Sequence, residues 1–352
     1  MARAVAHYSA LIAAGTEKAR ALDERGACYE RRSRFDLALQ DYSAALGENP
    51  ELAQAWYDRA RLYGKLDRHQ EAVDDYSQAI RLEPDRAAPY LGRAENYARL
   101  QRHREAVPDF DEALRREPQN VVARHGRAAS LTVLGETDKA IAELDEVLRA
   151  DPRYTPALLA RGEAQARAGR HAQALEDYAR YIAASPNDAY AHFRRGLSYA
   201  RLGRLEDAVT DFSDAIRLDP RLLSAYLERG RVYARLDHPD RAVLDLGEAV
   251  KLAPRYALAH NELAWLLATS KHDAVRDGKK AVEHARIAVE LAGADNPGYL
   301  DTYAAALAEA GQFGEAVKWQ SRALELPGFK GPARDQASAR LKLYEAGKPF
   351  RD

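Results

Sequence analysis

The sequence lacks several features that define specialised classes of protein. Its 352 residues include one cysteine, Cys28, so no internal disulfide can form and no cysteine cluster can hold zinc. The 53 Lys and Arg are balanced by 54 Asp and Glu, whereas a nucleic-acid binder needs a basic surplus. The longest apolar runs, such as residues 263–268, are far shorter than the ~20 residues that span a bilayer. We therefore expect no nucleic-acid partner and no membrane insertion.

Targeting and catalytic motifs are missing as well. The residues after Met1 are amphipathic and include His7 and Tyr8, unlike the basic and then apolar segment of a secretory signal, so we expect a cytoplasmic protein. Residues 278–280 (Gly-Lys-Lys) lack the preceding glycine and the hydroxyl residue of a phosphate-binding loop. The ten histidines are scattered, and none forms a His-Glu-x-x-His zinc motif. We expect no enzyme: no catalytic residue, no metal site and no cofactor.

A repeat of 34 residues dominates what the sequence does contain. Counting from Ala19 gives seven repeats without gaps, which cover residues 19–256. Every repeat has alanine at position 20 and proline at position 32. The alanines are Ala38, Ala72, Ala106, Ala140, Ala174, Ala208 and Ala242, and the prolines are Pro50, Pro84, Pro118, Pro152, Pro186, Pro220 and Pro254. Repeats of this length bury their apolar faces by stacking on one another, so the array is one extended domain.

Apolar residues within each repeat follow the period of an α-helix. In the second repeat two trios with three- and four-residue spacing each define one helical face: Trp56, Ala60 and Tyr63, then Ala72, Tyr76 and Ala79. Two helices per repeat are therefore predicted, and the repeated proline ends the second because it cannot continue the backbone hydrogen bonds. Pro108 is an exception, since it lies inside a second helix and predicts a local kink or a late helix start.

Small and large side chains also keep fixed places in the repeat. Position 8 is always glycine or alanine, as at Gly26, and we expect it to face the alanine at position 20 across the helix pair. A missing or short side chain there lets the two backbones approach closely. The large residues at position 24, such as Tyr42 and Phe110, are then expected to fill the gap to the next repeat.

These residues resemble the tetratricopeptide repeat family. The likeness is carried by Trp56-x-x-Arg59-Ala60-x-x-Tyr63 followed by Ala72, Tyr76, Ala79 and Pro84, and it extends over nearly the whole chain. The resemblance implies an all-α fold, a right-handed superhelical solenoid of helix-turn-helix repeats whose first helices line a concave groove. The chain would hold about nine repeats plus a leading half repeat.

The two ends of the array depart from the regular pattern. Residues 257–326 are expected to form two divergent repeats, the first with a five-residue insertion between Thr269 and Lys279. Residues 327–352 are expected to form a capping helix and tail. Residues 1–18 align with the second-helix positions of a repeat. Either they are a natural capping helix, or the chain was cut from a longer protein.

Position 7 is arginine and position 23 is acidic in the same seven repeats. The matching residues are Arg25 and Asp41, Arg59 and Asp75, Arg93 and Asp109, Arg127 and Glu143, Arg161 and Asp177, Arg195 and Asp211, and Arg229 and Asp245. In the eighth repeat the two positions become Leu263 and His284, and in the ninth Tyr303 and Trp319, so both members disappear together. We expect each arginine to pair with the carboxylate of its own repeat. A ladder of ligand-binding arginines is the alternative.

The resemblance places a ligand-binding face on positions 2, 5, 9, 12 and 13 of the first helices. From the third repeat onward this face turns apolar, and exposed apolar rows with aromatic and arginine side chains mark interaction sites. The candidate groove residues are Tyr57, Arg61, Leu91, His125, Leu159, Tyr190, Phe193, Leu227, Arg231, Asn261 and Trp265. The alternative is that some of them, such as Phe193 and Trp265, pack against a neighbouring helix.

The function predicted from these features is a non-catalytic scaffold that binds a protein or peptide ligand in the concave groove. Two alternatives stay open. One is a recruitment or regulatory domain of a larger multidomain enzyme, which the half-repeat start favours. The other is a self-assembling scaffold, a homo-oligomer formed through the superhelix ends, where Val5, Tyr8 and Ile12 pack on another copy.

Overall fold

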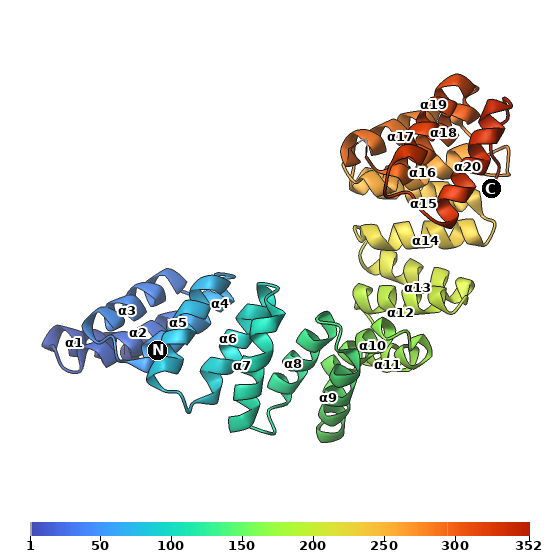
Figure 1. Ribbon diagram of the computed structural model, residues 1–352. Helices are drawn as coiled ribbons and strands as arrows, with labels where there is room; N and C mark the ends of the chain where they lie inside the picture. The colour runs from blue at the N-terminus through green and yellow to red at the C-terminus, as the bar shows by residue number, and fades with distance from the viewer. Residues whose placement is uncertain (1, 294) are drawn as a thin grey trace. The chain divides into compact units, whose positions relative to one another are not determined.

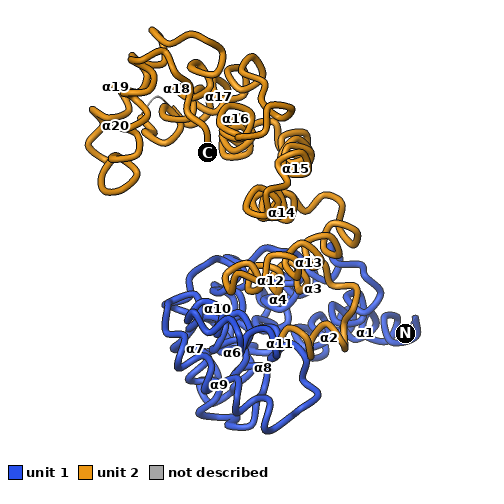
Figure 2. Tube along the Cα trace, turned by 90° about the vertical axis from the view of Figure 1, so that its right-hand side faces the viewer, with its two compact units in different colours: residues 1–177 blue, residues 178–352 orange. Residues whose placement is uncertain are grey.

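The computed structural model describes residues 2–293 and 295–352, and every regular element within them is an α-helix (Figure 1). The chain divides into two compact units, residues 1–177 (unit 1) and residues 178–352 (unit 2), which are coloured separately in Figure 2. In chain order the helices are α1 (Ala2–Ala14), α2 (Lys18–Glu30), α3 (Phe35–Glu48), α4 (Ala53–Lys65), α5 (His69–Leu82), α6 (Ala87–Arg99), α7 (His103–Arg116), α8 (Val121–Val133), α9 (Thr137–Ala150), α10 (Thr155–Arg167), α11 (His171–Ala184), α12 (Ala189–Arg201), α13 (Leu205–Leu218), α14 (Leu223–Arg235), α15 (Pro239–Leu252), α16 (Ala257–Thr269), α17 (Gly278–Ala292), α18 (Pro297–Glu309), α19 (Phe313–Glu325) and α20 (Pro332–Glu345). The all-α prediction is confirmed.

Within each unit the helices pack as consecutive pairs. In unit 1, α2 packs on α3, α4 on α5, α6 on α7 and α8 on α9, and in unit 2 α12 packs on α13, α14 on α15, α16 on α17 and α18 on α19. The second helix of a pair also contacts the first helix of the next, as α3 does α4 and α13 does α14. Neighbouring repeats therefore cover the apolar faces that a single pair leaves open. None of the described helices is long and apolar enough to cross a membrane.

The repeated proline marks the end of each second helix, as expected. From α3 to α15 the second helices end two residues before their prolines, for example at Leu82 before Pro84. Pro108 lies inside α7, which nevertheless begins at His103, so the late helix start is wrong. Because a helical N–H donates to the carbonyl four residues back, Pro108 removes the hydrogen bond to the carbonyl of Arg104.

Large side chains at position 24 lie between two first helices. A Cβ added to Gly26 would lie 2.8 Å from the ring of Tyr42 and 3.3 Å from the backbone oxygen of Ala38, so positions 8 and 20 do face each other. On the other side of such a ring lies the next repeat. A Cβ added to Gly92 there would come within 2.3 Å of Cζ of Tyr76. Glycine at these places allows the close approach that stacking requires.

The arginine pairs form as predicted, within each repeat. The salt bridges are Arg25–Asp41, Arg59–Asp75, Arg93–Asp109, Arg127–Glu143, Arg161–Asp177, Arg195–Asp211 and Arg229–Asp245. Each aspartate accepts from two nitrogens of its arginine, as in Arg93 Nε to Asp109 Oδ2 at 2.7 Å and Nη2 to Oδ1 at 2.8 Å. These forked contacts join the first helix of a repeat to its second helix.

Six of the seven arginines make a further bond that sequence reasoning missed. The third guanidinium nitrogen, Nη1, reaches back to the repeat before, to a residue 16 positions earlier. The backward bonds are Arg25–Ser9, Arg59–Ser43, Arg93–Ser77, Arg127–Asp111, Arg161–Asp145 and Arg229–Ser213. Alanine, Ala179, stands at the corresponding place before Arg195 and offers no acceptor. Each of the six therefore links three helices.

The C-terminal repeats are less regular. The turn between α16 and α17 covers residues 270–277. His284, at the acidic position of the missing eighth pair, lies beside His260, with the two Nδ1 atoms 3.0 Å apart. Burial, and then the neighbouring His260, lower the pKa of His284. Helix α20 follows α19. The insertion, the capping role of the C-terminal segment and the subdivision of the chain at residues 18, 256 and 326 remain predictions.

Candidate partner-binding site

Two polar candidate groove residues of unit 1, Arg61 and Tyr57, contact other side chains of that unit. Arg61 on α4 donates to both carboxylate oxygens of the buried Glu30, over 2.9 and 2.7 Å. Tyr57 is half-buried, and the guanidinium carbon of Arg86 lies 4.3 Å from its ring centroid. These contacts occupy the charged and aromatic faces that a partner would use.

The other three candidates of unit 1 are half-buried. Leu91 packs against the core cluster around Phe110. The ring of His125 lies 5.6 Å from that of Tyr154, and burial lowers the pKa of His125. Leu159 on α10 has intermediate exposure. Of the five candidates in unit 1, four are therefore half-buried, and the fifth, Arg61, is paired with Glu30.

The candidates of unit 2 divide by burial. Tyr190 is 46 % exposed at the start of α12. Phe193 is half-buried, with its ring centroid 5.8 Å from that of Phe212. Leu227 is only 6 % exposed and belongs to a core cluster with Leu246, so its side chain is not part of an open surface.

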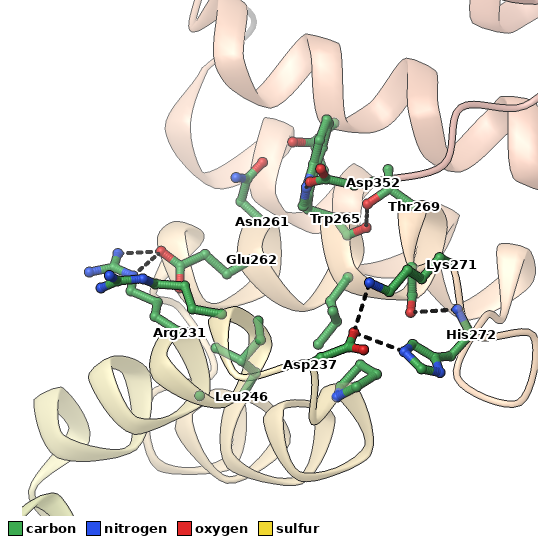
Figure 3. A pocket seen from close by; sticks show the side chains of 17 residues that line it. Arg231, Asp237, Leu246, Asn261, Glu262, Trp265, Thr269, Lys271, His272 and Asp352 are labelled. Carbon is green, nitrogen blue, oxygen red and sulfur yellow. Dashed lines mark hydrogen bonds and ion pairs between the residues drawn. The ribbon is translucent and has the colours of Figure 1, made fainter. Parts of the chain in front are cut away.

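The structure brings the last three candidates together. Arg231 on α14 and Asn261 and Trp265 on α16 line one open cleft of about 680 Å³, which Figure 3 shows from close by. Leu246 and Asp352 are also in its wall. The cleft thus combines apolar surface with a few polar groups, which is the usual make-up of a binding site.

Most of the charged side chains in the wall of this cleft are paired with one another. Arg231 Nε lies 2.9 and 3.0 Å from the two carboxylate oxygens of Glu262, which is itself half-buried. On the opposite wall Asp237 accepts from His272 Nε2 at 2.9 Å and from Lys271 Nζ at 3.1 Å (Figure 3). These two bonds, that of His272 first, lower the pKa of Asp237. With Arg235 and Asp352 the described lining holds three Lys or Arg and three Asp or Glu side chains, so the charge of the cleft is balanced.

Asn261 is the unsatisfied group of the cleft. Its Oδ1 atom is buried, yet it accepts no hydrogen bond from any part of the chain that the structure describes. A buried polar atom without a partner costs about 1–3 kcal/mol, and native proteins rarely leave one without reason. A carboxamide can both donate and accept, so Asn261 is suited to pair with the N–H and C=O groups of an incoming backbone.

A short segment at the end of the chain, residues 348–352, lies against Trp265. We call this segment the strap. The ring of Phe350 lies 6.1 Å from that of Trp265, and the indole Nε1 donates to Asp352 Oδ2 at 3.2 Å. The backbone N–H of Asp352 donates to the carbonyl of Thr269 at 2.7 Å. Sequence reasoning missed the strap, because its contacts join residues 87 positions apart and occur once.

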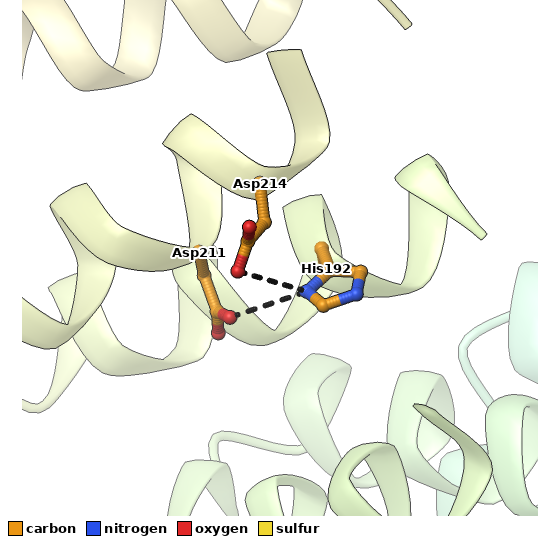
Figure 4. Close-up of side chains that lie close together, drawn as sticks. All are labelled: His192, Asp211 and Asp214. Atoms are coloured by element: carbon orange, nitrogen blue, oxygen red, sulfur yellow. Dashed lines mark hydrogen bonds and ion pairs between the residues drawn. The ribbon is translucent and has the colours of Figure 1, made fainter. Parts of the chain in front are cut away.

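A second polar group in unit 2 consists of His192 on α12 and Asp211 and Asp214 on α13 (Figure 4). His192 Nδ1 lies 3.5 Å from Asp211 and 3.9 Å from Asp214, and Nε2 lies 3.1 Å from the carbonyl oxygen of Pro186. Such a set could offer a cation three ligands. Both oxygens of Asp211, however, already accept from Arg195 at 2.7 and 2.8 Å. A bound cation would sit beside that guanidinium, so these residues fit a metal poorly.

Three protein-family models match the chain, and all three are described as tetratricopeptide repeat. The first matches residues 2–53, 91–155, 125–189 and 159–222, the second residues 53–86, and the third residues 223–256. The first model by itself matches more than half of the chain. No curated protein sequence matches.

Solved structures with the same architecture are distant in sequence. A tetratricopeptide repeat protein from Parabacteroides merdae is 18% identical, with 70% of this chain and 97% of that chain covered and a TM-score of 0.57. PilW, a type IV pilus biogenesis factor, is 22% identical, with 57% of this chain and 94% of that chain covered and a TM-score of 0.52. At such identities the likeness shows the fold alone, a stack of helical pairs.

Proposed function

The chain belongs to the tetratricopeptide repeat family, and from that premise we propose that it is a non-catalytic scaffold that binds a segment of a partner protein. The proposed binding site is the cleft of unit 2, with Arg231, Asn261 and Trp265 as contact residues. It is narrower than the full row of candidate groove residues, because these three are the candidates that line one cleft together.

One observation carries this proposal: the buried and unpaired Oδ1 of Asn261 in the wall of the cleft. A backbone N–H of the partner segment would satisfy that oxygen, and the side-chain N–H₂ would donate to the adjacent carbonyl. Trp265 and the stem of Arg231 supply the apolar and aromatic surface on which interfaces depend. The balance of positive and negative side chains in the lining favours a ligand with little net charge at this place.

The test is a selection of random linear peptides, displayed on phage, against the immobilised full chain. Peptides that bind the wild type are then measured against Asn261→Ala, which removes no bond present in the described structure. The matched control is Asn187→Ala, which removes the same side chain from an exposed turn of unit 2. We expect Asn261→Ala to weaken binding about tenfold or more and the control to leave it unchanged. Equal binding by wild type and Asn261→Ala contradicts the proposal.

A further inference from the structure

A second cleft lies in unit 1, away from the residues discussed so far. It has a volume of about 340 Å³, and its walls come from α1, the start of α2 and the start of α4. Glu17, Asp23 and Glu24 line it, and Arg20 is the one cation in its wall among the described residues. The wall is therefore acidic, in contrast to the balanced cleft of unit 2.

Asp23 is the unusual member of this wall. Its side chain is 6 % exposed, and its Oδ1 atom has no hydrogen-bond partner within the described part of the chain. Burial first, and then the nearby charges of Asp58 and Glu24, raise the pKa of Asp23 to about 7. The site thus holds a buried acid group whose Oδ1 atom has no donor and which forms no salt bridge with the described residues.

Three arginines of α2 and α4 are bound to other carboxylates or lie in the solvent. Arg25 is bound to Asp41 through two nitrogens, at 2.7 and 2.8 Å. Arg61 is bound to Glu30 in the same way. The side chain of Arg20 is 71% exposed and lies 3.6 Å from Glu17, in the solvent. None of these three arginines forms a salt bridge with Asp23, so the carboxyl group is available to a cation from a partner.

The geometry points to a binding site for a basic side chain: we propose that the cleft of unit 1 takes up one lysine or arginine of a partner polypeptide, with Asp23 as its ion-pair partner. The cleft is open on one side and has room for such a side chain. Glu24 and Glu17 add negative potential at its mouth, and Tyr8 and Leu11 of α1 offer apolar surface to the methylene stem. This site rests on the proposed function only in that its ligand is a polypeptide.

A metal ion is a poorer occupant than a basic side chain. Among the described residues the one set of three potential ligands at coordinating distance is that of His192 in unit 2. Asp23 and its neighbours do not form such a set. An ammonium or guanidinium group needs only a carboxylate within hydrogen-bond reach, and a buried pair of this kind gains strength from the low local dielectric.

The test uses the same phage-displayed random peptides, selected in parallel against full-length wild type, Asp23→Asn and Asp36→Asn. Asp36 is an exposed residue of α3, so its substitution removes the same charge from unit 1 without touching the cleft. We expect lysine or arginine to be enriched at one fixed peptide position by wild type and by Asp36→Asn, and the enrichment to disappear with Asp23→Asn. A selected peptide should lose about tenfold or more in affinity when Asp23→Asn is introduced.

The same loss is expected when the basic residue of the peptide is replaced by norleucine, and the two changes together should cost little more than either. Comparing lysine peptides with arginine peptides shows which head group is preferred. The proposal is overturned if the basic preference persists on Asp23→Asn, or if wild type selects no basic peptide. Peptides that depend on Asn261 but not on Asp23 would leave the proposed function standing, and the converse would leave only this site.

Discussion

A carboxyl group that is buried without a counter-ion lowers the stability of a folded protein whenever it is ionised. Asp23 is such a group, with a pKa of about 7 in the folded protein against an ordinary value of 3.8. Between these values the folded state holds a proton that the unfolded state has lost. The stability contributed by this residue therefore falls as the pH rises from about 4 to about 7, and the full cost is present above that range.

Replacing the carboxyl group should consequently stabilise the protein in a pH-dependent way. We expect Asp23→Asn to raise the free energy of unfolding by roughly 1–4 kcal/mol at about pH 8, and by clearly less at about pH 5. Urea unfolding at the two pH values measures the difference, with Asp36→Asn as the control that should show no such trend. A gain that does not change with pH would mean that Asp23 is not the titrating group.

At the scale of helices, the ion pairs at positions 7 and 23 join the two helices of a repeat at partly buried places. In the third repeat the side chain of Arg93 is 19% exposed and that of Asp109 is 8% exposed. The ninth repeat solves the same problem without charge, because Tyr303 and Trp319 stand at these positions with their ring centroids 5.2 Å apart. Both members of the ion pair can therefore be replaced together by uncharged side chains, whereas replacing one member leaves the other charge without its partner.

This comparison yields a prediction for the third repeat. Arg93→Leu by itself should destabilise α6 and α7 by roughly 2–4 kcal/mol, since it leaves Asp109 buried without a counter-ion. Adding Asp109→Leu should restore most of that loss, because two apolar side chains of similar volume can pack there. Urea unfolding of the single and double variants gives the coupling between the two sites. A double variant as unstable as the sum of its parts would refute the argument.

The strap is an element whose role is open to direct measurement. Phe350 packs on Trp265 and lies under the guanidinium of Arg340, whose carbon is 5.3 Å from its ring centroid. Phe350→Ala should cost about 1–3 kcal/mol of local stability, because the side chain is only partly buried. Hydrogen exchange at the Asp352 amide and in α20 should speed up, while Lys348→Ala, an exposed neighbour, should change nothing. Unaltered exchange in Phe350→Ala would show that the ring does not hold the strap.

Features that recur in every repeat can be predicted from the sequence, whereas features that occur once cannot. The helix pairs and the seven ion pairs follow from regular positions, and Arg231, Asn261 and Trp265 share a cleft because two adjacent first helices carry them. Leu227 occupies an equivalent position but is buried, since Leu246 and its neighbours pack around it. Neither the isolation of Asp23 nor the strap has a periodic signal, because both arise from contacts between segments of different kinds.

At the scale of the whole chain, the bonds from six arginines to the residue 16 positions earlier connect successive repeats. Arg195 lacks this bond, because Ala179 has no side-chain acceptor. We expect Ala179→Ser to give Arg195 the acceptor that five arginines find in serine or aspartate of unit 1. The gain should be about 0.5–1.5 kcal/mol, reduced by the poorer helix propensity of serine. Ala183→Ser, on an exposed face of the same helix, is the matched control and should be neutral or slightly destabilising. A gain shared by both variants would have nothing to do with Arg195.

Six of the seven position-7 arginines bind one residue 16 positions ahead and another 16 positions behind, and this spacing bears on how such a chain can lengthen. A block of 34 residues, such as 53–86, carries its position-7 arginine, Arg59, the aspartate that this arginine needs, Asp75, and the serine that serves the arginine of the next block, Ser77. Copying that block in frame by gene duplication therefore breaks no connection at either junction and creates a complete new one. The chain can therefore lengthen by whole repeats during evolution, and no further substitution is needed to restore the bonds between repeats.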